Sequence, residues 1–393
     1  MNLRPLLLLL PLSAFAQDDP WDDSAWEEDW GDEESGVVWS GFIEGAFGTR
    51  FDADPLIDNR NTLEDLRWRI ETDWQFDDLT LSLKADAGYD GIEDSWIADI
   101  RDLTMAFPIG ESIDIKIGRQ VQTWGTGDLV FLNDLFPKDY VSFFAGRDDE
   151  YLKAPGNAVR ITSYSDAINV DFVWTPVFEP DVYLTGERFS FYSPIDGGNV
   201  APRPPFSAPE PDKKFSNGEF ALRLYRTVES TEYAFYAYRG FSKQPFFVPM
   251  NAYGASFRRP AGPGLINFET SYYDSEDDNN QLRFLAGYEW EARPNFTVGL
   301  QYYLERHDNR DNLHWLTNRL TYRTGRDRHT WSLFTFYSPS DDDWYLRPGY
   351  TYRHSDRWSI TAGANLFGGR DADTFFNQLQ DASNAYVRVR FHY

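Results

Sequence analysis

Cysteine is absent from the 393 residues, and its absence excludes several kinds of chemistry. Without thiols the chain can form no disulfide bond, no thiolate metal site and no thiol redox centre. A chain of this length must then be held together by its core or by a closed network of hydrogen bonds. Histidine is scarce as well, because only five are present and all lie in the C-terminal quarter.

Long apolar runs and basic residues are also in short supply. After the first sixteen residues no stretch approaches ~18 uninterrupted apolar positions, so the sequence predicts no transmembrane helix. The chain has 63 acidic and 37 basic residues, which gives a formal charge of −26. Because nucleic acid is itself a polyanion, this balance argues against a nucleic-acid partner.

Motifs of common enzyme classes are missing. The sequence has no HExxH, no GxSxG and no EF-hand loop, and the GTGD at 125–128 lacks the lysine of a phosphate cradle. A hydrolase would need a histidine beside a serine or an aspartate, and His314 with Ser332 or Asp308 is the nearest candidate. The sequence therefore predicts a protein that is not an enzyme and has no cofactor or metal site, with a barrel hydrolase as the least favoured alternative.

Aromatic residues, in contrast, are abundant. The chain contains 14 Trp, 23 Tyr and 31 Phe, which together make up 17% of its residues. A soluble protein rarely needs so many amphipathic rings, whereas barrels that cross a membrane place Trp and Tyr in girdles at both interfaces.

The N-terminal region divides into two segments with different compositions. Residues 1–16, MNLRPLLLLLPLSAFA, combine one Arg, a leucine-rich core and an Ala-x-Ala ending, which predicts a cleaved signal peptide. Residues 17–35 contain ten acids, three tryptophans and no base. Such a composition cannot bury enough apolar surface to fold alone, so we expect a disordered periplasmic segment. It is either a solvated leader or a docking peptide for a periplasmic or inner-membrane partner.

From residue 36 to residue 393 the hydrophobic period is two. Leu66, Trp68 and Ile70 alternate with Arg67 and Arg69, and similar alternation recurs to the C-terminus. Successive strand residues point to opposite faces, so each segment has one apolar and one polar face. Eighteen segments are predicted, although sixteen remain possible because those near 95 and 250 alternate poorly. They start near residues 37, 62, 79, 95, 112, 155, 167, 217, 231, 250, 264, 281, 295, 313, 328, 344, 357 and 384.

Three observations favour a transmembrane, antiparallel, up-and-down β-barrel over a soluble sandwich. The segments reach about ten to twelve residues, enough for a tilted membrane crossing. Tight turns alternate with long connections such as 177–216, whose prolines favour extended, unpaired backbone. The chain ends on a strand whose outward residues resemble the C-terminal signal for the barrel assembly machinery. An even strand count would place both termini in the periplasm of a Gram-negative cell. The proposed signal residues are Val387, Val389, Phe391 and Tyr393.

The polar faces of the predicted strands carry charges of both signs. A charged barrel interior implies a water-filled lumen, where rows of charge can set selectivity. The acids outside the strands concentrate in the predicted outer loops, where they could hold cations that bridge lipopolysaccharide and other outer-membrane lipids. The lumenal charge ladder is predicted to consist of Arg67, Arg69, Glu71, Asp73, Lys84, Asp86, Asp114, Lys116, Arg347, Arg388 and Arg390.

One segment interrupts the β pattern. After the strand that ends near Gln122, Gly125 and Gly127 permit a sharp turn, and apolar residues then recur at helical spacing over 129–136. Asp128 is placed to cap such a helix and Pro137 to stop it. We expect this excursion, 124–153, to fold into the barrel as a constriction or gate; the alternative is that it lies outside, against water or lipid head groups. Its principal residues are predicted to be Trp124, Gly125, Gly127, Asp128, Asn133, Asp134, Phe136, Pro137 and Asp139.

The same segment carries a family resemblance. GRQVQTWGTGDLVFLNDLFPKDY (118–140) and GRDDEYLKAPGNAVR (146–160) resemble a family of proteobacterial outer-membrane proteins that share a GRQxxxWG core and are described as porins or barrels of unknown function. Further likeness lies in TGERFSFYSP, ALRLYR, YGASFR, FYSPSDDDWYLRP and the C-terminal strand. The resemblance implies a barrel of about eighteen strands, and some relatives accompany inner-membrane exporters of the RND class. It supplies no substrate and no catalytic residue.

Two functional hypotheses follow. The first is a passive outer-membrane channel for a small hydrophilic or amphipathic solute, with 124–153 as constriction. The alternative is an outer-membrane component that works with an RND-type exporter in lipid or hydrophobic-compound transport.

Overall fold

The computed structural model describes residues 37–277, 279–308 and 311–393, which belong to one compact unit. The predicted signal peptide, 1–16, and the acidic segment, 17–35, lie outside the described residues. No helix in the described part of the chain is long and apolar enough to cross a membrane.

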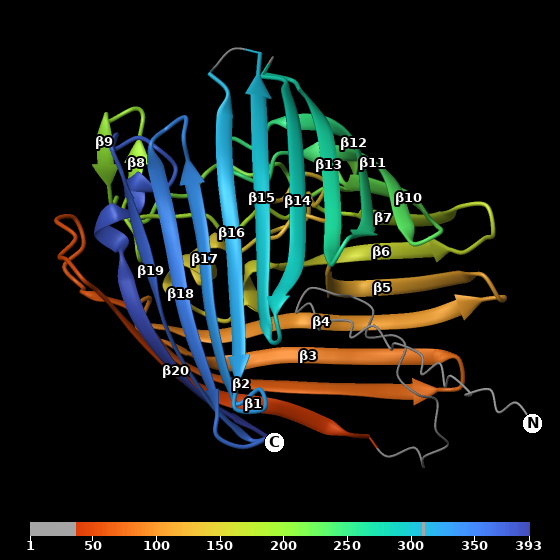
Figure 1. The fold of residues 1–393 in the computed structure, drawn as a ribbon, viewed down its shortest axis with the longest axis horizontal. Helices are drawn as coiled ribbons and strands as arrows, with labels where there is room; N and C mark the ends of the chain where they lie inside the picture. Colours follow the sequence, from red (N-terminus) through yellow and green to blue (C-terminus); the bar gives the residue numbers. More distant parts are fainter. Residues whose placement is uncertain (1–36, 278, 309–310) are drawn as a thin grey trace, which may run out of the picture. The chain divides into compact units, whose positions relative to one another are not determined.

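Eighteen antiparallel strands form a single closed sheet (Figure 1). Each barrel strand pairs with the next one along the chain, and β1 pairs with β20 to complete the ring. Closure pairs every strand with a neighbour on each side, which is the condition for a β-structure to span a membrane. The barrel strands are β1 (Trp39–Arg50), β2 (Asn61–Phe76), β3 (Leu79–Asp90), β4 (Ser95–Ile109), β5 (Ile113–Val121), β6 (Pro155–Ser163), β7 (Asn169–Thr175), β10 (Glu219–Val228), β11 (Thr231–Phe241), β12 (Pro249–Ala261), β13 (Gly264–Ser275), β14 (Gln281–Arg293), β15 (Phe296–His307), β16 (Leu313–Thr324), β17 (His329–Ser338), β18 (Asp343–Arg353), β19 (Trp358–Gly369) and β20 (Asn384–His392).

The predicted strand starts all lie within two residues of the observed ones, so the count of eighteen is confirmed and sixteen is wrong. The segment near 95 alternates poorly because β4 contains a bulge. Arg101 has no partner in β3 between the pairs Lys84↔Asp102 and Ala85↔Ile100. The extra residue shifts the parity, so both Arg101 and Asp102 face the interior.

The two ends of the barrel differ. At one end, which we call the turn end, the strands are joined by tight turns such as 77–78 and 262–263. Strand β1 begins at this end and strand β20 ends there. At the other, the loop end, the connections are longer. The longest, 176–218, was expected to be unpaired, but it includes a small hairpin of β8 (Phe191–Ser193) and β9 (Gly198–Val200) and the short helix η2 (Phe215–Asn217). A further short helix, η3 (Asn377–Ala382), precedes β20.

The C-terminal strand is tied to β2 across β1. Tyr393 Oη donates to the backbone carbonyl of Arg69 at 2.8 Å and accepts from Trp68 Nε1 at 2.7 Å. Val387 and Val389 are 40% and 39% exposed, on the face that carries the apolar residues. Recognition of this strand by the assembly machinery stays a prediction.

The predicted helix over 129–136 is wrong. Those residues are irregular, and Leu129 has a φ of +57°, outside the right-handed helical region. Side chains of the wall bind this backbone instead, as where Tyr273 donates to the Leu132 carbonyl at 2.5 Å. The helix lies further on, as α1 (Tyr140–Ala145), followed by η1 (Asp149–Leu152). Its N-cap is Asp139, which accepts from the backbone N–H of Ser142 at 2.7 Å, in place of the predicted Asp128.

Candidate functional site: a loop across the barrel interior

Residues 122–154 leave the wall at the end of β5 and run through the barrel interior until β6 begins. Alternate side chains of β5 point inward, and this alternation continues past its end through Gln120, Gln122 and Trp124. Each of these three residues is at least nine-tenths buried. Gly125 then adopts a φ of +93°, which glycine tolerates and other residues rarely do. A Cβ on Gly127 would lie 2.3 Å from the Val130 carbonyl oxygen. Both predicted glycines are therefore required where the chain turns into the lumen.

The first side of the loop is bound to β15 and β16 through Asp128. Its carboxylate accepts two hydrogen bonds from the Arg319 guanidinium, at 2.5 and 2.7 Å. Its backbone N–H donates to Gln301 Oε1 at 2.8 Å, and Gln301 Nε2 donates to its carbonyl at 2.9 Å. Bidentate, charge-assisted pairs of this kind are about twice as strong as neutral hydrogen bonds. Asp128 is thus an anchor of the loop.

Strand β13 supplies the neighbouring contact. Glu269, which is 1% exposed, accepts from the backbone N–H of Thr126 and, at 3.3 Å, from Asn133 Nδ2. Asn267 Nδ2 donates to the Thr126 carbonyl at 2.9 Å. A buried carboxylate is costly unless it is hydrogen-bonded, so these loop contacts and Glu269 stabilise each other.

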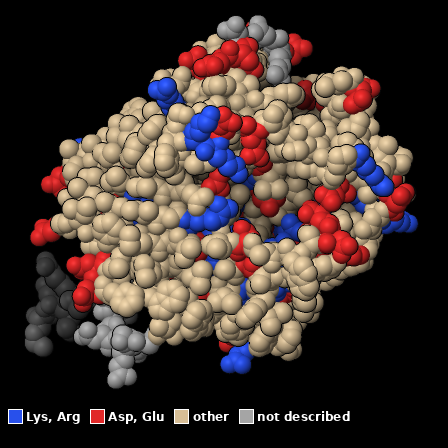
Figure 2. All heavy atoms as spheres, turned by 180° about the vertical axis from the view of Figure 1, so that it is seen from behind, with Lys and Arg blue, Asp and Glu red and all other residues tan. Residues whose placement is uncertain are grey.

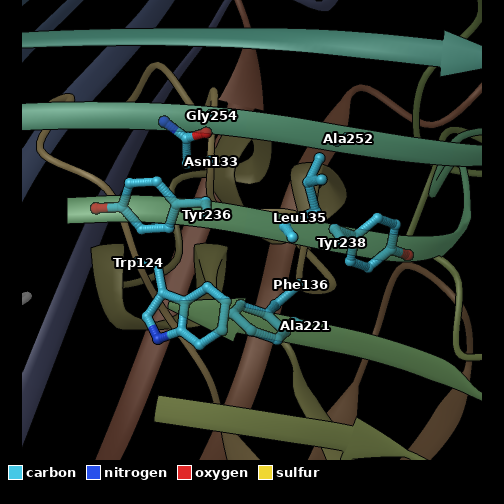
Figure 3. Close-up of a pocket in the computed structure, with 10 residues that line it drawn as sticks. Trp124, Asn133, Leu135, Phe136, Ala221, Tyr236, Tyr238, Ala252 and Gly254 are labelled. Atoms are coloured by element: carbon cyan, nitrogen blue, oxygen red, sulfur yellow. The ribbon is translucent and has the colours of Figure 1, made fainter. Parts of the chain in front are cut away.

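Apolar packing secures the same side of the loop. Trp124 and Phe136 meet edge to face with centroids 5.0 Å apart, and they lie against the inner faces of β10 to β12, where Ala221 and Ala252 are small (Figure 3). A Cβ on Gly254 would come within 1.7 Å of Asn133 Oδ1. Residues on the inner face of β12 are small because the loop occupies that space, which explains the poor alternation of the segment near 250.

The second side of the loop is bound across the barrel by three consecutive acids, Asp148, Asp149 and Glu150, here the acidic triplet. Asp148 accepts from Arg388 Nη1 at 2.9 Å and from Arg390 Nη2 at 3.0 Å, both on β20. Asp149 pairs with Arg347 of β18, and Glu150 pairs with Arg69 of β2. The two arginines beside Asp148 hold the pKa of its carboxyl well below the usual range despite its burial. Four ladder arginines therefore find counter-charges in the loop.

Residues on either side of the triplet add further contacts to β2, β3 and β4. Arg147 donates to Asp65 at 2.7 Å and to Asp90 at 2.6 Å. Tyr151 donates to Asp86 Oδ2 at 2.7 Å. Its ring lies under three guanidinium groups, whose distances from the ring centroid are 4.8 Å for Arg67, 5.1 Å for Arg69 and 4.8 Å for Arg101.

The predicted ladder residues fall into two groups. One group contacts the loop or its immediate partners: Arg67, Arg69, Asp86, Arg347, Arg388 and Arg390. The other lies nearer the turn end or pairs within the wall: Glu71 with Lys84 at 3.5 Å, Lys116 with Asp102 at 3.1 Å, and Asp73 and Asp114 opposite Ser82 and Thr162 of neighbouring strands. The selectivity role of the ladder stays a prediction.

The remaining predicted loop residues hold the loop's own shape. Asp134 accepts from Thr123 Oγ1 and from Lys138 Nζ, each at 2.8 Å. The Pro137 carbonyl accepts from the backbone N–H of Ala154 at 3.0 Å, which brings the outgoing and returning arms together.

Several residues of the site were missed from the sequence. The acidic triplet was placed in the excursion but was given no partner, and Glu269 and Gln301 were not singled out. The alternation of β13 and β15 places both residues on the inner face, so they could have been proposed as lumenal. Their pairing with Thr126 and Asp128 depends on which part of the loop reaches β13 and β15, and the strand pattern carries no signal for that.

A third attachment joins the loop to the long connection 176–218. Asp181 Oδ1 accepts from the backbone N–H of Lys138 at 2.7 Å, and Asp181 Oδ2 accepts from Gln244 Nε2 at 2.5 Å. Burial raises the pKa of the Asp181 carboxyl to about 6, although Lys138 and Lys243 oppose the shift. The pKa of this carboxyl is therefore shifted in the direction opposite to that of Asp148.

We expect acid to hold the loop more firmly in place. Because the docked pKa of Asp181 exceeds its ordinary 3.8, the stabilisation is fully present below pH 4 and is lost as pH rises through about 6. In bilayer recordings, the fraction of time spent in the high-conductance state should fall by roughly tenfold or more from pH 7 to pH 4. Asp181→Asn keeps the acceptor for Lys138 and should flatten this dependence. An unchanged pH profile in the variant would rule Asp181 out as its source.

The predicted pairing of His314 with Ser332 is not formed. His314 pairs with Leu304 near the loop end of β16, and its Nδ1 lies 2.8 Å from Tyr302 Oη. Ser332 lies opposite Thr321, further towards the turn end. The predicted His314–Ser332 neighbours are therefore separated along the strands.

Comparison with known proteins yields structural matches alone. No family model and no curated protein matches the sequence. Among solved structures, Acinetobacter baumannii OccAB3 is 10% identical with a TM-score of 0.58, over 92% of this chain and 100% of that one. Pseudomonas aeruginosa OccK11 (OpdR) is 8% identical with a TM-score of 0.55, over 91% and 95%. Salmonella typhi OmpF, in complex with daunomycin, is 9% identical with a TM-score of 0.47, over 91% and 97%. The chain has the fold of outer-membrane porins.

Proposed function

We propose that this barrel is a passive outer-membrane channel for a small hydrophilic or amphipathic solute, with residues 124–153 as its constriction. The observation that carries the proposal is the attachment of one loop to opposite sides of the barrel interior. Asp128 is held at β15 and β16, whereas the acidic triplet is held at β2, β18 and β20. Thr126 is also held by Glu269 of β13, and in the ring of eighteen strands β13 lies opposite β2, where Arg69 holds Glu150. The loop therefore narrows whatever path runs along the barrel axis.

The charge of the inner face supports a polar solute. Buried charges are costly unless paired, and here arginines of the wall meet acids of the loop, as Arg388 meets Asp148 at 2.9 Å. Exposed inner charges such as Asp73 and Asp114 lie nearer the turn end. A path lined in this way favours water and hydrated solutes over bare hydrocarbon.

The test is planar-bilayer recording of the purified full chain beside a variant that lacks residues 125–150. The intact protein should give small, steady unitary currents, and the deletion should raise the conductance because it removes both anchors with the loop. A barrel that is silent in both forms, while it retains its heat-resistant folded band on a gel, would overturn the proposal.

Joint transport with an inner-membrane exporter stays a prediction from the sequence. The segment proposed to recruit such a partner, 17–35, lies outside the described residues.

A further inference from the structure

The strands β5, β6 and β7 are much shorter than β4, which borders them on one side. These strands have 9, 9 and 7 residues, whereas β4 has 15. The ladder between β4 and β5 ends at the pair Leu103↔Arg119. Residues 95–102 of β4 therefore rise above the end of β5 with no partner in that strand. At about 3.3 Å per residue this unpaired edge is roughly 26 Å long.

Arg119 bridges the start of this gap. Its Nε donates to the carbonyl of Ile100 on β4 at 2.7 Å, where the backbone ladder has already ended. Its Nη1 donates to Glu179 Oε2 at 2.9 Å, and Glu179 Oε1 also accepts from Asn157 Nδ2 of β6 at 2.7 Å. One side chain thus joins β5, β4 and the long connection.

The GRQ motif has a structural meaning at this position. Gly118 has a φ of +136°, and a Cβ there would lie 2.1 Å from the Leu103 carbonyl oxygen, so only glycine lets β4 and β5 approach so closely at the last pairs. Arg119 then reaches across the gap, and Gln120 points inward and is buried. The motif therefore marks the place where the wall opens.

A cavity of about 770 Å³ occupies the gap. Its lining includes inward-facing residues of the wall, such as Arg67 and Asp99, together with Arg119 and Asn157, which point outward by the parity of β5 and β6. A cavity lined by both faces of a sheet passes through the wall. On the face of the molecule seen from behind, acidic and basic side chains gather around a hollow (Figure 2).

The gap lies at the level of the membrane. On β4 the outward apolar residues continue from Ile109 up to Trp96, which is 84% exposed and meets Tyr89 edge to face at 5.5 Å. On β5 the outward apolar row runs from Ile113 to Ile117 and is then interrupted by Arg119. Aromatic residues such as Trp96 settle at membrane interfaces, so the polar cavity sits beside the loop-end half of the apolar band.

We infer that this gap is a side portal through which an amphipathic molecule with a charged polar head passes between the barrel interior and the surrounding membrane. A hydrocarbon chain can remain on the outward residues of β4, such as Ile100 and Leu103, which are 40% and 52% exposed. The head can enter a cavity that offers both signs of charge, including Arg119 and Asp99. Bare hydrocarbon would have to cross these charges without replacing their hydrogen bonds, which is costly.

The portal deepens the proposed function, because it names an amphipathic solute and a lateral route. It can nevertheless fail independently of axial conduction. The chain has no cysteine, so single cysteines can be introduced without removing native ones.

The experiment labels one cysteine with a fluorophore in phosphatidylcholine vesicles that contain a nitroxide on the lipid head group. Asp99→Cys probes the portal, and Asp73→Cys probes the inner face near the turn end. Phe107→Cys gives the quenching expected of a lipid-facing site on β4. The label at 99 should be quenched at least twice as strongly as that at 73. Adding Arg119→Ala, which removes the bridge to Ile100, should increase the quenching at 99.

A second test blocks the portal with a bulky side chain. Asn157→Trp should reduce quenching at position 99 to the level at 73 and leave axial ion conductance unchanged. Equal quenching at 99 and 73, with and without Arg119→Ala, would overturn the portal. If the unsubstituted chain conducts no ions, that result would count against the proposed channel, whatever the quenching shows.

Discussion

Neutralising the acidic triplet, as Asp148→Asn, Asp149→Asn and Glu150→Gln together, is expected to raise single-channel conductance several-fold and to shift selectivity towards anions. Asp149→Asn leaves the buried Arg347 without its counter-charge, whereas Arg388 and Arg390 keep Glu44, and Arg69 keeps Asp86, as a remaining partner. Removing one partner of a buried ion pair costs about 3–5 kcal/mol. Undocking the loop lets water reach Arg347, Arg388 and Arg390 and relieves that cost. The widened lumen then carries three fewer negative charges beside these arginines, which favours anions.

The measurement is unitary current with a salt gradient across the bilayer, which reports conductance and ion selectivity together. A matched control removes the same number of charges at exposed acids of the loop end, as Glu276→Gln, Asp371→Asn and Asp373→Asn. The control should change conductance little, because exposed charges are screened by salt. If the triplet variant conducts like the control, the triplet does not hold the constriction.

Replacing Gly146 by alanine is expected to displace the returning arm of the loop. Gly146 is the C-cap of α1 with a φ of +89°, and a Cβ there would lie 2.2 Å from Tyr386 Cδ1. A left-handed conformation at a residue other than glycine costs about 1–3 kcal/mol, and the ring of a wall residue cannot retreat without disturbing β20. The strained residue would directly precede Arg147 and the acidic triplet in the chain.

Limited trypsin digestion of the folded barrel measures this displacement. Cleavage after Arg147 or Lys153, both buried in the intact protein, should become at least tenfold faster in Gly146→Ala. The double variant Gly146→Ala with Tyr386→Ala removes the overlap and should recover part of the protection, which leaves the contribution of the backbone strain. Gly45→Ala is the control, because a Cβ there meets nothing within 4 Å. Equal protection of Gly146→Ala and Gly45→Ala would contradict the expected tight fit of the loop against β20.

Sequence reasoning succeeded where the structural cause is local. The alternation of Leu66, Trp68 and Ile70 with Arg67 and Arg69 follows from the pleat of a strand, which points successive side chains to opposite faces. For the same reason the strand starts could be predicted to within two residues. The two segments that alternated poorly were strands altered by their surroundings, through a bulge at Arg101 and through the loop packed against Gly254.

Sequence reasoning failed where distant side chains hydrogen-bond to the backbone of the loop. The apolar spacing over 129–136 predicted a helix, but Tyr273 and Gln301 of the wall hydrogen-bond to Leu132 and Asp128 and leave the backbone irregular. An isolated turn of helix has too few hydrogen bonds of its own to outweigh such contacts. Helix formation was therefore decided by partners that lie more than 130 residues away in the chain.

By itself, then, the sequence determined that the chain builds a barrel of alternating strands with a charged interior and one excursion that begins at Gly125. The tertiary structure alone decided that the excursion crosses to Arg388, Arg347 and Arg69. It alone also decided that the pairing of β4 with β5 ends at Arg119. The physical reason is that the pleat acts between adjacent residues, whereas a counter-charge is chosen only once ring closure has brought distant strands around the loop.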